Sequence, residues 1–222
     1  MTPEPLFIDH VLIAVADLAA GARRLETEYG LRALEGGRHP GVGTANMIVP
    51  LGSAYLELIA VVDPEEASRA PTAGRVARAI AEGRTFATWA VRTDNLDALR
   101  EHLLAAGWAL PAPNPGARIR PDGVTLRWRT QVLVPAYDPS VLPFVIEWSL
   151  PPGMHPAEMP VDHPSNAQGI RLVRLGDPHP AAASDRLHAL LGDGVSLEVE
   201  EAPVSGVLAV EVNTSSRVIA IQ

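Results

Sequence analysis

The 222-residue sequence contains no cysteine and no lysine. Without cysteine there are no disulfides, thiolate metal ligands or cysteine nucleophiles, which fits the reducing cytoplasm, where we expect the protein to reside. All 18 basic residues are therefore arginines, and 26 acidic residues bring the net charge to −8. Because nucleic-acid binding needs clustered positive charge, we expect no nucleic-acid partner.

Long apolar runs and several common catalytic motifs are also missing. No stretch reaches the roughly 18 consecutive apolar residues that cross a bilayer, so we expect no membrane partner. The sequence has no Gly-x-Ser-x-Gly elbow, no P-loop and no His-Glu-x-x-His motif. These absences leave a globular protein that acts on, or binds, small molecules.

One pattern occurs three times along the chain. It reads HVLIAVADL at residues 10–18, TWAVRTDNL at 88–96 and IRLVRLGDP at 170–178. Each copy is a strand-like run that ends in Asp or Asn and leads into an amphipathic stretch. Such residues cap helices by accepting hydrogen bonds from the first free amides, and we interpret Asp17, Asp94 and Asp177 as caps.

Strand-like segments follow each amphipathic stretch. They are NMIVPL and AYLELIAVV, then VTLRWRTQVLV and PFVIEWSL, then VSLEVEEA, GVLAVEVN and SRVIAIQ. The unit is a strand, a helix and two or three antiparallel strands, which predicts an α+β fold. We predict paired βαβββ modules at 6–62 and 85–150, which together form a domain at 6–150. A proline-rich strap at 151–168 and a truncated third module at 169–222 complete the chain.

Several phrases in this order resemble the glyoxalase-like branch of the vicinal oxygen chelate superfamily. They are GGRHPGVGTANMIVPLGSAYLELIAV, ATWAVRTDNLDAL, PDGVTLRWR and LPFVIEW. The superfamily includes glyoxalase I, extradiol dioxygenases, methylmalonyl-CoA epimerase and bleomycin-resistance proteins. The resemblance implies tandem βαβββ modules that form a curved mixed sheet around a cleft.

The resemblance also implies a metal site. Each module of such proteins gives the metal one ligand from its first strand and one from its last, which here are His10 and Glu57, then Thr88 and Glu147. A threonine hydroxyl is a poor ligand for Fe, Mn, Zn, Ni or Co. The expected metal ligands are therefore His10, Glu57 and Glu147, and the departure at Thr88 leaves metal dependence open.

The residues themselves support a site around the two glutamates. Glu57 lies in the apolar strand AYLELIAVV. A carboxylate in such a strand is costly to bury unless it is hydrogen-bonded, paired or bound to a metal. Glu147 in PFVIEWSL presents the same problem. The alternative is an edge strand whose glutamate faces water. His10 is either a hydrogen-bonded core histidine or, given its place in the repeat, a ligand.

Four further residues are candidates for substrate binding: Thr88, Asn46, His39 and Arg127. In TLRWRT either Trp128 or the flanking pair Arg127 and Arg129 faces inward, because successive strand residues alternate. Other aromatic and histidine residues are assigned to the scaffold. Trp89 and Trp148 are predicted to fill the core, and His102, His155, His163 and His188 to be non-catalytic.

The leading hypothesis is a small-molecule enzyme with lyase or isomerase chemistry in a cleft between the first two modules. A divalent metal would polarise a substrate oxygen, or a carboxylate, Glu57 or Glu147, would act as general base. The alternative is a metal-free binding protein that sequesters a ligand, as drug-resistance proteins do. We expect a homodimer, with the third module packed on a sheet edge or on another subunit.

Overall fold

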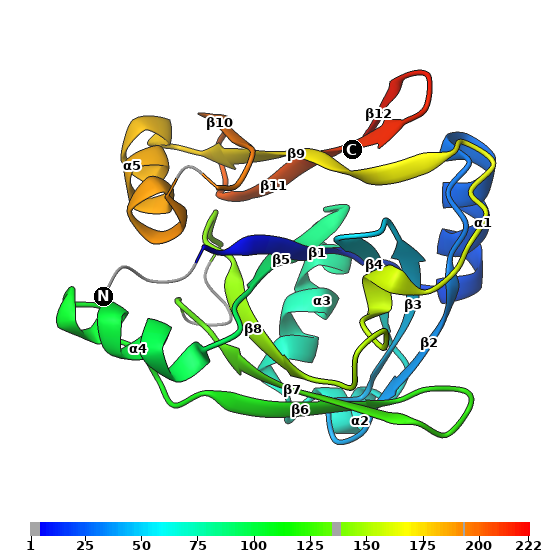
Figure 1. The fold of residues 1–222 in the computed structure, drawn as a ribbon, viewed down its shortest axis with the longest axis horizontal. Helices are drawn as coiled ribbons and strands as arrows, with labels where there is room; N and C mark the ends of the chain where they lie inside the picture. Colours follow the sequence, from blue (N-terminus) through cyan, green and yellow to red (C-terminus); the bar gives the residue numbers. More distant parts are fainter. Residues whose placement is uncertain (1–4, 135–138, 193) are drawn as a thin grey trace.

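The computed structural model describes residues 5–134, 139–192 and 194–222. Eight strands close into a barrel in the order β1-β4-β3-β2-β6-β7-β8-β5 (Figure 1). Their bounds are β1 Phe7–Ala14, β2 Leu34–His39, β3 Thr44–Pro50, β4 Tyr55–Val61, β5 Phe86–Arg92, β6 Asn114–Ile119, β7 Thr125–Gln131 and β8 Phe144–Ser149. The curved mixed sheet predicted from the sequence is present, and it closes on itself.

Both halves of the barrel follow the order strand, helix, three strands. Helix α1 (Leu18–Tyr29) follows β1, and helix α4 (Leu96–Ala105) follows β5. Within each half the first and last strands pair in parallel, β1 with β4 and β5 with β8. The halves join through antiparallel β1 and β5 on one side and through β2 and β6 on the other, which closes the barrel.

The helix caps agree with the prediction in the first copy and differ in the others. Asp17 accepts a hydrogen bond from the backbone N–H of Ala20 at 2.6 Å. In the second copy Asn95, rather than Asp94, caps α4 by accepting from the N–H of Ala98 at 3.0 Å. Asp177 accepts from the N–H of His179, one residue before helix α5 (Pro180–Leu191), whose N-cap has no side-chain hydrogen bond.

The barrel interior is covered from two sides. The linker between the halves forms the short helix α2 (Pro64–Ala67) and then α3 (Pro71–Ala81), which packs against β1, β4 and β5 (Figure 1). Val76 and Ala79 of α3 pack against Leu12 and Ile59 of the barrel wall. Apolar contacts therefore close the interior on the side of α3.

The predicted proline-rich strap covers another part of the barrel. Its 3₁₀ turn η1 (Pro156–Glu158) places Ala157 against Ile48 and Tyr55. Farther along, His163 accepts a hydrogen bond from the N–H of Arg32 at 3.0 Å, and its Nε2 lies 2.7 Å from the carbonyl oxygen of Pro50. His163 therefore anchors the strap, in keeping with its predicted non-catalytic role.

The C-terminal segment forms a separate sheet. Its strands are β9 Ala167–Asp177, β10 Leu197–Glu201, β11 Gly206–Thr214 and β12 Val218–Ile221, in the order β10-β9-β11-β12. The element order again is strand, helix, three strands, but here the strand after the helix, β10, pairs in parallel with the first. The predicted third module therefore has a different strand order from the two halves of the barrel.

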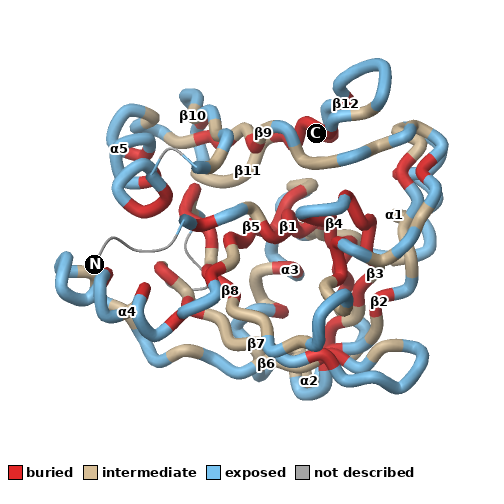
Figure 2. Tube along the Cα trace, viewed as in Figure 1, coloured by how far each residue is buried: buried red, intermediate tan, exposed pale blue. Residues whose placement is uncertain are grey.

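This second sheet lies over β1 and β5, with β11 in contact with β5, and most residues of these two strands are buried (Figures 1 and 2). Trp89 of β5 is fully buried there and donates its indole N–H to the carbonyl oxygen of Val141 at 2.8 Å, so its predicted core role is confirmed. In the part of the chain that the structure describes, no helix has the length and apolarity to cross a bilayer.

Candidate functional site

The first strand brings two consecutive ionisable side chains together. The pairing of β1 with β5 shifts register between Ile8 and His10, and such a β-bulge changes the direction of the side chains beside it. Asp9 and His10 are both buried, with 0% and 3% of their surface exposed. Asp9 Oδ1 lies 2.5 Å from His10 Nδ1. The bulge therefore allows one strand to supply a buried carboxylate–imidazole pair.

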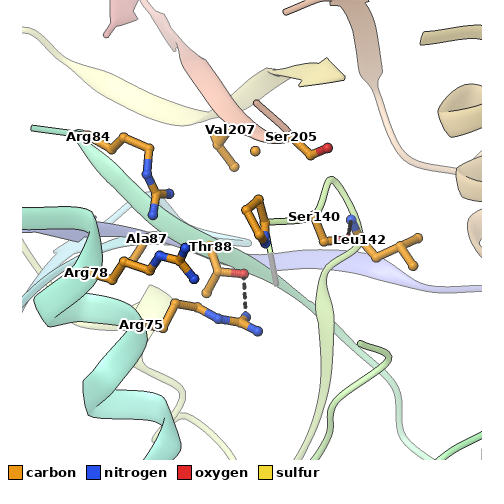
Figure 3. A pocket seen from close by; sticks show the side chains of 11 residues that line it. Arg75, Arg78, Arg84, Ala87, Thr88, Ser140, Leu142, Ser205 and Val207 are labelled. Atoms are coloured by element: carbon orange, nitrogen blue, oxygen red, sulfur yellow. Dashed lines mark hydrogen bonds between the residues drawn. The ribbon is translucent and has the colours of Figure 1, made fainter. Parts of the chain in front are cut away.

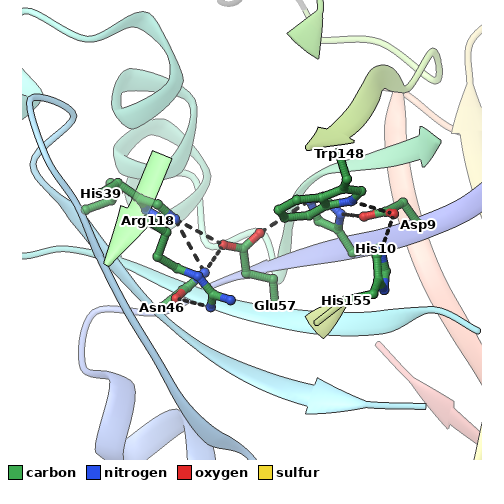
Figure 4. Close-up of polar contacts among 9 residues, drawn as sticks. Asp9, His10, His39, Asn46, Glu57, Arg118, Trp148 and His155 are labelled. Carbon is green, nitrogen blue, oxygen red and sulfur yellow. Dashed lines mark hydrogen bonds and ion pairs between the residues drawn. The ribbon is translucent and has the colours of Figure 1, made fainter. Parts of the chain in front are cut away.

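The second oxygen of Asp9 is also bound (Figure 4). It accepts a hydrogen bond from Trp148 Nε1 at 3.0 Å and lies 3.0 Å from His155 Nε2. Burial by itself raises the pKa of Asp9, but its hydrogen bonds to His10 and His155 and their positive charge outweigh burial and hold that pKa well below its usual range. Asp9 is therefore a buried anion that orients two imidazoles.

Glu57 of β4 faces the other nitrogen of His10. Its Oε2 lies 3.4 Å from His10 Nε2, while its Oε1 accepts a hydrogen bond from Asn46 Nδ2 at 2.5 Å. A second imidazole approaches the same carboxylate, with His39 Nε2 3.9 Å from Oε1. With Asp9 at Nδ1, the other nitrogen of His10, Nε2, is directed at Glu57.

The neighbours of Glu57 are themselves held in place. His39 Nδ1 lies 2.8 Å from the hydroxyl oxygen of Thr44. Burial lowers the pKa of His39; the charge of Glu57 opposes this shift and that of Arg118 adds to it. His39 is therefore favoured as a neutral imidazole.

Arg118 of β6 places a guanidinium in the barrel interior. Its side chain is 2% exposed, and its Nη1 donates to Asn46 Oδ1 at 3.1 Å. Its Nη2 is buried and has no hydrogen-bond partner among the described residues. Gly36 makes room for this arrangement, because a Cβ there would lie 2.1 Å from Asn46 Oδ1 and 2.4 Å from Arg118 Nη1.

Aromatic rings wall the polar cluster. The ring of Tyr55 stacks on His10 with centroids 4.6 Å apart, and Phe144 meets the same imidazole edge-on at 5.5 Å. Trp128 lies 6.0 Å from His39 and 5.1 Å from Trp148. These rings limit the water around the cluster, which strengthens the electrostatic interactions within it.

Two predicted orientations on β7 and β8 are corrected. Trp128 is the inward residue of TLRWRT, so Arg127 is exposed on the outer face and is not part of the cluster, contrary to its predicted substrate-binding role. On β8 it is Trp148 that faces the cluster, although we predicted it for the core. Strand alternation therefore turns Glu147 away from Glu57.

Glu147 serves the scaffold instead of the predicted metal or catalytic site. Its Oε1 accepts a hydrogen bond from the N–H of Leu96 in the first turn of α4 at 3.0 Å, and its Oε2 accepts from Arg129 Nε at 2.7 Å. Both contacts lie outside the barrel interior. They account for an acidic residue in an apolar strand without a metal.

The strand register shows which residue of the second half corresponds to Glu57. Across the parallel pair β1–β4, Leu12 lies opposite Glu57. Ala90 is 90 − 12 = 78 residues further on, the same offset that relates the caps Asp17 and Asn95, and it lies opposite Phe144 across β5–β8. An aromatic ring therefore occupies the place of a second carboxylate.

The predicted metal ligands are not assembled. Among the described residues, no group of three His, Asp or Glu side chains is arranged to hold a metal ion. Beside His10 and Glu57 lie the imidazole of His39, the Nδ2 group of Asn46, which donates to Glu57, and the guanidinium of Arg118, which is a donor and cannot bind a metal. These residues therefore do not form a set of metal ligands.

Thr88 faces the barrel interior but serves another contact. Its hydroxyl oxygen accepts a hydrogen bond from Arg75 Nη1 at 3.1 Å, in a pocket beside α3. Of the predicted site residues, His10, Glu57, Asn46 and His39 come together, whereas Thr88, Arg127 and Glu147 do not join them.

Sequence reasoning missed four members of the cluster: Asp9, Arg118, Trp148 and His155. A signal was present for one of them, because Asp9 is an acidic residue inside an apolar strand directly before His10. Strict alternation placed it on the opposite face, and only the bulge brings it to the same side. For Arg118, the adjacent glycines of GGRH are a weak sign of close packing.

The sequence model of the glyoxalase-like domain matches residues 8–191. The chain therefore belongs to the glyoxalase-like domain family, within the vicinal oxygen chelate superfamily. No curated protein sequence matches the chain.

Two solved structures illustrate the similarity in fold. A hypothetical protein from Staphylococcus aureus is 16% identical with a TM-score of 0.80, and the match covers 96% of this chain and 92% of that one. A methylmalonyl-CoA epimerase from Streptomyces coelicolor, in complex with 2-nitronate-propionyl-CoA, is 17% identical with a TM-score of 0.50, over 66% of this chain and 100% of that one. At these identities the comparisons establish the shared fold.

Proposed function

We propose that the protein is an isomerase or lyase that moves a proton on a carbon next to a carbonyl group of a small molecule. The observation that carries this proposal is the buried carboxylate of Glu57, with His10 Nε2 at 3.4 Å from one oxygen and His39 Nε2 at 3.9 Å from the other. A carboxylate and an imidazole in contact are the groups that general acid–base catalysis requires.

Glu57 is the proposed base. It takes the proton from the substrate carbon, the C–H bond breaks, and the electron pair moves into the carbonyl to give an enolate. Its position supports this role, because the carboxylate is buried in the barrel interior and contacts the imidazole of His10. The hydrogen bond from Asn46 fixes Oε1, which leaves Oε2 directed toward His10.

Arg118 is the proposed partner of the enolate oxygen. A buried donor without a partner is costly, and its unbonded Nη2 is such a donor. A substrate oxygen beside it would satisfy the donor and gain charge stabilisation as the enolate forms. Gly36 and Gly37 of β2 leave the space that the side chain of Arg118 occupies beside Asn46.

His10 is the proposed acid that returns the proton. Asp9 holds Nδ1 and stabilises the imidazolium, so that Nε2 delivers a proton on the side of Glu57. Delivery of this proton to a neighbouring carbon, or to the opposite face of the same carbon, gives an isomerase, and the proton on Glu57 Oε2 then passes to His10 Nε2, which restores both groups. Loss of a group from the neighbouring carbon after the first proton transfer gives a lyase.

Access of a substrate to Glu57 depends on the two segments that cover the barrel interior, α3 and the strap. Helix α3 and the strap pack against residues of the barrel interior, and we infer that a substrate reaches Glu57 when one of these covers moves and that its return excludes water from the enolate. A pocket on the side of the strap is lined by Trp148 and His155, the two residues that contact Asp9 Oδ2. The epimerase among the structural neighbours is compatible with isomerase chemistry on this fold.

Proton transfer next to a carbonyl is detectable without knowing the product. The protein is incubated in D₂O with a panel of acyl-CoA thioesters, including methylmalonyl-CoA, and of hydroxy-ketones and hydroxy-aldehydes. Proton NMR then follows deuterium entering at the carbon next to the carbonyl. We expect enzyme-dependent exchange with at least one compound. Ligand binding without exchange in any compound would instead favour a sequestering protein.

A further inference from the structure

The pocket on the side of the strap has a volume of about 220 Å³. Its walls come from the turn between β3 and β4, the end of β5, β8 and the strap. Pockets for drug-sized ligands measure about 300–1,000 Å³, so this one suits a smaller molecule. By contrast, the pocket beside α3 and Thr88 (Figure 3) has a volume of only about 20 Å³, which is room for a water molecule.

Charges of both signs line the larger pocket without pairing with each other. Arg92 contributes a guanidinium, and Asp94 and Glu158 contribute carboxylates. Among the residues that the structure describes, no ion pair joins Arg92 to a carboxylate, and the side chains of Asp94 and Glu158 have no hydrogen bond or ion pair. Both carboxylates are exposed, whereas Arg92 is half-buried. The pocket therefore presents one positive and two negative groups to its contents.

Two contacts hold the side chain of Arg92 in place. Its Nη1 donates to the carbonyl oxygen of Ser53 at 2.6 Å, and its guanidinium carbon lies 5.5 Å from the centre of the Phe7 ring. A guanidinium carries several N–H donors, and within the described part of the chain only the carbonyl of Ser53 accepts from this one. A carboxylate can pair with two such donors at once. Arg92 is therefore a positioned partner for the carboxylate of a ligand.

We propose that this pocket binds a small zwitterion of the α-amino acid type. The ligand carboxylate pairs with Arg92, and its ammonium group lies toward Asp94 and Glu158. The side chain of the ligand lies against the indole of Trp148. An anion alone would meet two carboxylates, and a cation alone would meet the guanidinium, so a molecule that carries both charges is favoured over either. The proposal does not depend on the chemistry at Glu57.

The walls of the pocket are tied to one another. The N–H of Gly52 donates to the carbonyl oxygen of Ala157 at 3.1 Å, which joins the turn between β3 and β4 to the strap. Trp148 and His155 both contact Asp9 Oδ2 at 3.0 Å, which joins β8 to the strap. A ligand therefore meets a pocket that is already formed, which reduces the cost of ordering it on binding.

Titration of the nitrogen-15-labelled full chain with L-leucine, L-glutamine and L-phenylalanine tests the proposal. Assigned proton–nitrogen NMR spectra follow the indole N–H of Trp148 and the backbone N–H groups that line the pocket. We expect saturable shifts of these signals with at least one of the three amino acids. The analogues that lack the amino group or the carboxylate, which for L-leucine are 4-methylpentanoate and 3-methylbutylamine, should each bind roughly tenfold more weakly.

Variants test the two kinds of charge separately. Arg92→Gln should weaken binding of the amino acid roughly tenfold, the usual effect of losing a charge-assisted hydrogen bond. The double variant Asp94→Asn, Glu158→Gln should also weaken it roughly tenfold, but should bind the analogue without the amino group at least as well as the wild type does. Arg127→Gln, which removes a positive charge from the outer face, should bind like the wild type.

Circular dichroism establishes that each variant is folded, and the double variant serves if Arg92→Gln does not fold, because its two side chains have no hydrogen bond or ion pair among the described residues. Three results would each overturn the proposal. They are the absence of saturable shifts with all three amino acids, equal affinity for an amino acid and its analogue without the amino group, and wild-type affinity in the folded double variant.

Discussion

Asp9 and His10 are neighbours in the sequence and also hydrogen-bonded through their side chains, with Asp9 Oδ1 2.5 Å from His10 Nδ1. Consecutive residues of a regular strand point to opposite faces, so this contact depends on the bulge in β1. It leaves His10 Nε2 on the side of Glu57. The proposed acid–base pair therefore rests on a local irregularity of one strand.

Replacing Asp9 with Asn tests this arrangement. An amide holds the tautomer of His10 less strictly and does not stabilise an imidazolium, so we expect a mixture of tautomers and proton exchange on a substrate slower by about 10²–10⁴-fold. Nitrogen-15 NMR of the histidine rings measures the tautomer. Asp17→Asn, which changes an exposed helix cap by the same charge, is the control. Unchanged His10 signals in Asp9→Asn would contradict the orienting role.

His39 predicts a pH dependence of stability. Its folded pKa is lowered from 6.5, mainly by burial, so just below pH 6.5 the unfolded chain binds a proton that the folded chain does not. The free energy of unfolding should therefore fall as the pH drops below 6.5, by at most about 1.4 kcal/mol per pH unit from this group. Urea unfolding at several pH values measures it. His39→Gln should give a shallower slope over that interval, and an identical slope would contradict the prediction.

Gly36→Ala tests the packing of Arg118. The added Cβ would lie within 2.4 Å of Asn46 Oδ1 and of Arg118 Nη1, so one of these side chains must shift. We expect a loss of stability of about 1–3 kcal/mol, typical of overpacking. Gly169→Ala, where the nearest atom is 3.9 Å away, is the matched control. Equal thermal stability of the two variants would show that the interior can absorb the change.

Glu147→Gln tests the scaffold role of the second glutamate. The amide weakens the hydrogen bond from the N–H of Leu96 and the ion pair with Arg129, which should cost about 1 kcal/mol of stability. Proton exchange on a substrate should remain within about twofold of wild type, because this side chain lies outside the interior. A large loss of exchange with stability unchanged would return Glu147 to the catalytic group.

Much of the fold could be predicted from the sequence because the pattern repeats. The strand-like runs and the cap at Asp17 indicate where strands and helices begin, and the cap predicted at Asp94 lies one residue further on, at Asn95. The position of α3 could not be predicted in the same way. Its place against β1, β4 and β5 follows from long-range packing of Val76 and Ala79, which no local pattern records.

Only the part of the candidate site that lies in the first half of the barrel could be predicted from the sequence. Glu57 and Asn46 lie on a strand pair with regular alternation, and the structure brings them together with His10 and His39. Glu147 was assigned by analogy between the halves, but the residue that corresponds to Glu57 is Phe144, and the offset of three residues along β8 turns Glu147 to the opposite face.

The proposed base is tested most directly by comparing Glu57→Gln with Glu147→Gln. Both variants replace a strand glutamate with the same amide, but only Glu57 contacts His10. Deuterium exchange on the substrate found for the wild type should become undetectable in Glu57→Gln and stay near the wild-type rate in Glu147→Gln. Exchange at the wild-type rate in a folded Glu57→Gln protein would contradict the assignment of Glu57 as the base.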